Sequence, residues 1–184
     1  MKFPKIIKLA KKTTGKTIAL YDGPAYRAQW ISIGPAAYCI GDRFSLNPQA
    51  LLQIMGIPDE KKSDWTVFTD PLTEYQEILL DEEPHSEDTA CRFLPLGLML
   101  EDGCYQPFLA AGKVWLVKSE LLEPFDEGIG TDFRLREVVL PNGETKTGML
   151  CRNGFSLEAV IIVSPGITPP YGEILRLLME PGNE

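Results

Sequence analysis

The residues with the most recognisable chemistry are the Gly-Lys-Thr triplet at positions 15–17, which closes the stretch KKTTGKT. The same triplet ends the phosphate-binding loop G-x-x-x-x-G-K-[ST], but Ala10 stands where the first glycine of that pattern belongs. Such a loop also runs from a strand into a helix, so that phosphate meets the positive end of the helix. Here a predicted helix precedes the triplet and a predicted strand follows it. We therefore do not expect a nucleotide to bind at this loop.

Other chemistry-bearing residues are sparse or badly spaced. The four cysteines, Cys39, Cys91, Cys104 and Cys151, include no C-x-x-C pair, and His85 is the only histidine of the chain. Zinc sites usually draw on closely spaced pairs, so we interpret the cysteines as small buried apolar residues and His85 as a solvated loop residue. No G-x-S-x-G motif is present either. The sequence thus names no catalytic residue, no cofactor and no metal ligand.

One feature of the sequence still suggests a function, which is an uneven distribution of charge along the chain. The first 16 residues hold six lysines and no acidic residue, whereas the rest of the chain holds 12 of the 18 basic and all 26 acidic side chains. A basic helix on an acidic body can follow phosphates while the remaining surface repels them. The residues predicted to contact nucleic acid are Lys5, Lys8, Lys11, Lys12 and Lys16. The alternative, a solvated terminus that attracts the chain's own acidic surface, stays open.

These lysines must be positioned by a helix near the N-terminus. Ile6, Leu9 and Ala10 share one face by three-and-four spacing, Pro4 suits a first helical turn, and Gly15 fits a left-handed C-terminal cap. A second helix is predicted over 47–56, capped by an asparagine and opened by a proline, and a third over 169–180 at the C-terminus.

Most of the remaining chain predicts strands. Short runs rich in branched and aromatic residues alternate with turn signals, and Asn-Gly pairs at 142–143 and 153–154 predict two tight hairpins. Trp30 and Trp115 lie in strand-like alternation, which favours core positions over a stacking platform for single-stranded nucleic acid. Ser119 is predicted to cap a helical turn. The fold class is therefore α+β, with a predominantly antiparallel sheet and about three short helices.

A polar, acidic segment over 58–89 divides the chain and is predicted to be an exposed loop or linker. We expect a single domain over 1–184, built from two sheet-rich halves, 1–80 and 90–184, on either side of it. An apolar content of 44% and a charged content of 24% are typical of globular proteins. No apolar run approaches the roughly 20 residues that span a bilayer. We expect no membrane partner and a cytoplasmic location.

The arrangement of several segments resembles small uncharacterised proteins encoded in prophages and mobile elements of Gram-positive bacteria. The segments that carry this resemblance are IIKLAKK, QWISIGPAAYCI, ALLQIMGIP, KVWLVKSELLEPF and GMLCRNGFSLEAVIIV. The resemblance implies a genetic context of DNA replication, recombination and packaging. It carries over no catalytic residue.

Together these features predict a non-enzymatic accessory or adaptor protein of phage or mobile-element type, whose basic N-terminal helix contacts DNA or an acidic protein surface. A clamp-like, ring-forming assembly would suit such a subunit by analogy. Two alternatives stay open. One is an interaction module that forms homo-oligomers without nucleic acid, and the other is a small enzyme whose site residues are scattered along the sequence.

Overall fold

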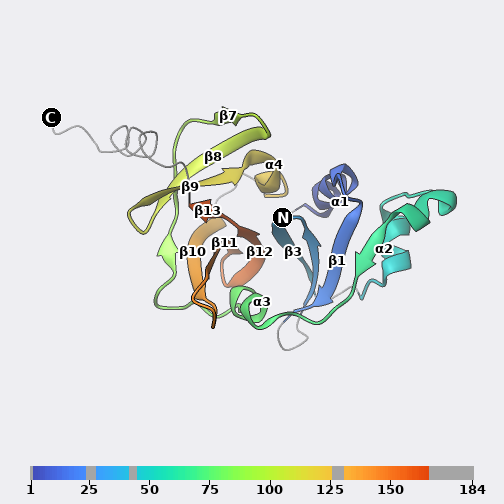
Figure 1. Ribbon diagram of the computed structural model, residues 1–184, viewed down its shortest axis with the longest axis horizontal. Helices are drawn as coiled ribbons and strands as arrows, with labels where there is room; N and C mark the ends of the chain where they lie inside the picture. Colours follow the sequence, from blue (N-terminus) through green and yellow to red (C-terminus); the bar gives the residue numbers. More distant parts are fainter. Residues whose placement is uncertain (1, 24–27, 42–44, 126–130, 166–184) are drawn as a thin grey trace.

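The computed structural model describes residues 2–23, 28–41, 45–125 and 131–165, which form an α+β fold with mostly antiparallel strands (Figure 1). The helical segments are α1 (Phe3–Lys12), α2 (Pro48–Ile54), the 3-10 helix η2 (Asp59–Asp64), α3 (Glu74–Leu79) and α4 (Ser119–Leu122). The strands are β1 (Thr17–Asp22), β2 (Gln29–Ile33), β3 (Ala36–Gly41), β4 (Thr66–Phe68), β5 (Thr89–Ala90), β6 (Arg92–Phe93), β7 (Leu98–Leu100), β8 (Gly103–Ala110), β9 (Lys113–Lys118), β10 (Thr131–Val139), β11 (Thr145–Asn153), β12 (Ser156–Ile162) and β13 (Ser164–Pro165).

The larger sheet has eight strands in the order β4-β1-β2-β3-β12-β11-β10-β5. All of its neighbours are antiparallel except β1 and β4, which run parallel. Its strands therefore come from both sides of the acidic segment, because β3 pairs directly with β12. The smaller sheet has the order β13-β9-β8-β6, with β7 also paired to β8.

Both predicted Asn-Gly hairpins are confirmed. One joins β10 to β11 and the other joins β11 to β12, and the glycines at their turns, Gly143 and Gly154, have φ values of +82° and +60°. A side chain at such a φ is strained, so glycine relieves the tight reversal. These two turns fix the register of β10, β11 and β12 in the larger sheet.

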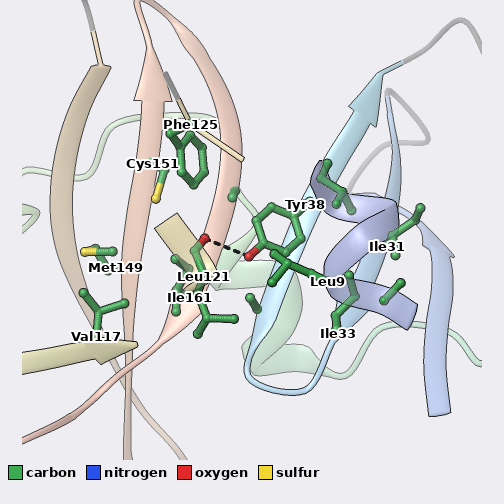
Figure 2. Close-up of a cluster of buried hydrophobic side chains, with 14 of the residues drawn as sticks. Leu9, Ile31, Ile33, Tyr38, Val117, Leu121, Phe125, Met149, Cys151 and Ile161 are labelled. Atoms are coloured by element: carbon green, nitrogen blue, oxygen red, sulfur yellow. Dashed lines mark hydrogen bonds between the residues drawn. The ribbon is translucent and has the colours of Figure 1, made fainter. Parts of the chain in front are cut away.

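The larger sheet buries both of its faces, one against α1 and the smaller sheet and the other against α3 (Figure 1). Figure 2 shows the first of these cores, where Leu9 of α1 lies near Ile31, Ile33 and Tyr38. The fully buried Tyr38 hydroxyl donates a 2.8 Å hydrogen bond to the Leu121 carbonyl of α4. This bond satisfies two polar groups inside the core and ties α4 to the sheet.

The first helix forms as its pattern predicts. Ile6, Ile7, Leu9 and Ala10 are all buried, which fixes α1 to the body of the molecule. The predicted cap at Gly15 is wrong. The chain leaves the helix at Thr13 in an extended conformation, and the positive φ, +48°, belongs to Lys16.

Three further helix predictions have different outcomes. The predicted helix 47–56 is confirmed as α2, and the side chain of Asn47 accepts a 2.8 Å hydrogen bond from the Ala50 amide. The predicted capping role of Ser119 is wrong, because α4 begins at this residue and its hydroxyl donates instead to Cys104 Sγ. The predicted C-terminal helix 169–180 lies outside the described residues.

The acidic segment 58–89 was predicted to be an exposed loop, but it is largely structured. It contains η2, β4 and α3, so the described part of the chain has five helical segments where the sequence predicted about three in all. The Thr73 amide donates to the Gln76 side chain and caps α3 at its start. Leu79 and Leu80 at the end of α3 are each 2% exposed, which anchors the segment on the sheet.

The aromatic and sulfur-bearing residues sit mostly as expected. Trp30 and Trp115 are 1% and 2% exposed, so they belong to the core and offer no stacking surface. Cys151 is buried and Cys39 and Cys91 are half-buried, but Cys104 is exposed, contrary to the expectation for it. Within the described ranges, no helix has the length and apolar character needed to cross a membrane.

Candidate functional site

The N-terminal helix presents lysines in several different environments. The exposed ones on the helix itself are Lys8, Lys11 and Lys12, which we call the lysine face. No hydrogen bond or ion pair joins any of these three side chains to the described residues. Because α1 is anchored by its opposite side, this charge is held on a fixed part of the surface.

Lys16 does not extend this face. Its Nζ forms a 2.9 Å ion pair with Asp64 Oδ2 at the end of η2. The neighbouring Thr17 hydroxyl donates to the Gly15 carbonyl. Helix α1 precedes this triplet and strand β1 follows it, which is the reverse of the order in a phosphate-binding loop. Lys16 is thus neutralised by the chain's own carboxylate.

Lys5 is also separated from the lysine face. It is half-buried and lines a cavity of about 770 Å³ together with Phe125, Phe133 and Glu123. Within the face itself, Lys11 reaches toward the end of α2, since its Nζ would lie 3.8 Å from a Cβ at Gly56. The carbonyl end of a helix carries partial negative charge, which attracts this ammonium group. The six N-terminal lysines therefore do not form one continuous stripe.

A second cluster of positive charge lies at the far end of the larger sheet. Arg134 and Arg136 alternate along β10, and Arg152 of β11 lies opposite Asp132 in the strand register. Alternate residues of a strand point to the same face, so we call this group the arginine face. Arg136 and Arg152 are 2% and 5% exposed, an unusual burial for charged side chains.

Arg136 is fully satisfied. Its Nε and Nη2 donate to the two carboxylate oxygens of Asp88 at 2.7 and 2.6 Å. Its remaining donors reach the carbonyls of Ile78, Asp81 and Glu83 at 2.9 to 3.0 Å. A guanidinium group has five N–H donors, and all five are used here. This side chain clamps the acidic segment onto β10.

The electrostatics of Asp88 follow from this clamp. Burial raises the pKa of its carboxyl, but hydrogen bonds from Arg136 and from the His85 amide, with the Arg136 charge, outweigh burial and hold the pKa below its ordinary value. His85 Nε2 lies 3.1 Å from Asp81 Oδ2. His85 is therefore part of an ordered turn, and the Asp81 carboxylate is its side-chain partner.

The sequence analysis did not single out the arginine face. One signal was present: in TDFRLRE, charged residues alternate with apolar ones, which places Asp132, Arg134 and Arg136 on one side of a strand. The Asn-Gly turn at 153–154 then brings Arg152 back beside them. The burial of these arginines depends on α3 and the segment after it, which no local pattern reveals.

Comparisons with known proteins add no assignment. A scan against protein-family models finds no match, and searches of curated proteins and of solved structures find none either. Within the residues that the structure covers, no group of three or more His, Cys, Asp or Glu side chains is placed to hold a metal ion.

Proposed function

We propose that this chain is a non-enzymatic accessory protein of phage or mobile-element type that contacts the phosphate backbone of nucleic acid through the lysine face of α1. The observation that carries the proposal is the fixed display of Lys8, Lys11 and Lys12 without a carboxylate partner in the described chain. The net charge of the whole chain is −8, so the rest of the surface disfavours a polyanion.

The environments of the lysines reduce the number of residues that can contact phosphates. Lys16 is held by Asp64, and Lys5 is half-buried at a cavity that Glu123 also lines, so three of the five residues predicted from the sequence remain available to phosphates. Each phosphate contact releases counterions and contributes about −0.9 to the slope of log affinity against log salt concentration. Three contacts therefore predict a slope of roughly −2.7. Binding of this kind reads the backbone and not the base sequence.

The test is fluorescence anisotropy of a labelled DNA duplex across a salt series. The wild-type chain is expected to bind with the slope given above, and the Lys8→Glu, Lys12→Glu double variant is expected to lose most of its affinity. The Lys61→Glu, Lys113→Glu double variant changes two exposed lysines outside α1, in η2 and at the start of β9, and is the matched control for the change in net charge. Salt-independent binding, or equal losses in the double variant and the control, would contradict the proposal.

One further observation favours self-association as a second candidate function. On β7, Met99 is 78% and Leu100 is 41% exposed, and in the described chain this strand pairs with β8 alone. An apolar strand with a free edge can pair with the same strand of a second copy. Light scattering is expected to show a dimer that Met99→Lys converts to a monomer. A wild-type monomer would exclude this function.

A further inference from the structure

The arginine face contains one buried cation without a partner. Arg152 is 5% exposed, and its Nη2 atom is buried with no hydrogen-bond acceptor in the described structure. Burial and the neighbouring Arg136 charge lower the pKa of this guanidinium, which shows how poorly the site solvates it. Buried charged donors are normally paired, because leaving one unpaired costs its full desolvation. This residue therefore needs an explanation other than fold stability.

The nearby carboxylates of Asp81, Asp88 and Asp132 already pair with other side chains, and Asp81 lies 3.1 Å from His85 Nε2. Both oxygens of Asp88 accept hydrogen bonds from Arg136, and Asp132 Oδ2 accepts a 2.8 Å hydrogen bond from Arg134 Nε. Asp132 lies opposite Arg152 in the strand register but pairs along its own strand. Arg152 is thus the member of the arginine face that has no carboxylate paired with it in the described structure.

A cavity of about 440 Å³ opens beside this residue. Glu82 and Glu83 also line it, and neither carboxylate takes part in an ion pair or hydrogen bond with the described residues. Phe155, at the tip of the β11–β12 hairpin, lines the same cavity and is 97% exposed. Sites for small molecules usually measure about 300–1,000 Å³ and combine an apolar surface with a few placed polar groups.

The charges of this cavity select among ligands. A guanidinium group matches the planar geometry of a carboxylate, so Arg152 favours a carboxylate-bearing molecule. Arg134 also lines the cavity, but its Nε is paired with Asp132. Glu82 and Glu83 repel a ligand with a second negative charge and attract a positive one. A molecule with one carboxylate and one ammonium group satisfies both sides, and an apolar group on it would cover Phe155.

We propose that the cavity between Arg152, Glu82, Glu83 and Phe155 binds a small amino-acid-like zwitterion. Its carboxylate pairs with Arg152, its ammonium group pairs with the two glutamates, and its side chain packs on the exposed aromatic ring. This site lies on the opposite sheet face from α1 and is independent of the proposed contact with nucleic acid.

The first arm of the test uses the full wild-type chain and isothermal titration calorimetry. L-Phenylalanine is the lead probe, followed by the other standard amino acids. L-Phenylalanine is expected to bind saturably, and its analogues phenylpropionate and phenethylamine, which lack the ammonium and the carboxylate respectively, are expected to bind roughly tenfold more weakly or worse. Absence of binding by every amino acid, or equal binding by phenylpropionate, overturns the proposal.

The second arm uses variants of the chain. Arg152→Met, which keeps the length of the side chain, is expected to weaken binding roughly tenfold or more, and so is the Glu82→Gln, Glu83→Gln double variant. Because Glu82 is half-buried and Glu83 is exposed, the double variant tests the site even if Arg152→Met does not fold. The Glu60→Gln, Glu101→Gln double variant, with both changes at exposed residues outside the cavity, is the matched control and should bind like the wild type. Wild-type affinity in the Glu82→Gln, Glu83→Gln double variant overturns the proposal.

Discussion

The lysine face and the arginine face both gather positive charge, but they hold it in opposite ways. Lys8, Lys11 and Lys12 are exposed on a helix whose other side is buried. Arg136 and Arg152 are buried under the acidic segment at the end of the larger sheet. An ammonium group on a long flexible side chain is strongly hydrated, whereas a guanidinium group is weakly hydrated and offers a rigid fork of donors.

The difference has consequences for what each region can do. Exposed charges are screened by salt and contribute little to folding, so the lysine face is free to serve a polyanionic partner. Buried charges must be paired, so each arginine is committed either to the fold or to a ligand. Arg136 is committed to the fold through five hydrogen bonds, and Arg152 is not.

The largest expected effect on stability comes from breaking the contacts of Arg136 with Asp88 and with the backbone carbonyls of the acidic segment, which we call the clamp. Arg136→Met leaves Asp88 buried without its partner and frees three backbone carbonyls, so it should lower the free energy of unfolding by about 3–5 kcal/mol. Urea denaturation followed by circular dichroism measures this. A loss below about 1 kcal/mol, the range of a surface ion pair, would mean that the clamp is not structural.

Acidification should weaken the same clamp. The pKa of Asp88 is lower in the folded chain than its ordinary value of 3.8, so its contribution to stability is fully present above that value and is lost as pH falls through the folded pKa. Stability measured from about pH 5 to about pH 2 should fall, and the fall should be shallower in Asp88→Asn. An equal slope in both proteins would show that other carboxylates control acid unfolding.

Arg152→Met should affect stability far less than Arg136→Met. Removing a buried guanidinium that has an unpaired donor sacrifices no hydrogen bond in the described chain, so we expect a change in unfolding free energy within about 1 kcal/mol, in either direction. The same urea measurement compares the two variants. A loss as large as that of Arg136→Met would place Arg152 in the fold and not in a binding site.

The smallest effect on stability is expected at the lysine face. Lys8→Glu and Lys12→Glu change exposed residues without an ion pair in the described chain. Each should therefore change the free energy of unfolding by no more than about 0.5 kcal/mol. Thermal denaturation at low and high salt provides the comparison. A larger, salt-sensitive loss would show that these lysines stabilise the chain's own acidic surface.

The sequence predicted the parts of this fold that local patterns determine. The spacing of Ile6, Leu9 and Ala10 predicted α1, Asn47 marked the start of α2, and two Asn-Gly pairs marked the hairpins. The acidic segment was misjudged because its order comes from β10, about 50 positions further along the chain, through hydrogen bonds such as that of Arg136 to Glu83. The composition of the acidic segment indicated that it is polar, but it could not indicate which distant residues hold the segment in place.

The candidate sites show the same division. The sequence revealed how many lysines gather at the N-terminus, but the pairing of Lys16 with Asp64 spans 48 positions and could not be read from it. The alternation of charged residues over 132–136 was a signal that the sequence analysis did not use. Only the assembled structure distinguishes the satisfied Arg136 from Arg152, which has an unpaired donor. Charge is a property of the sequence, while pairing is a property of the fold.

The central claim is that the two cationic regions are separate binding surfaces for different ligands, a polyanion at the lysine face and an amino-acid-like zwitterion at the arginine face. Amide NMR spectra of the isotope-labelled full chain, titrated first with a short DNA duplex and then with L-phenylalanine, test it most directly. We expect the duplex to shift resonances of α1 alone, and the amino acid to shift those around Arg152 and residues 82–88 alone. Shifts from both ligands at the same residues, or no shift at α1 with the duplex, would contradict the account.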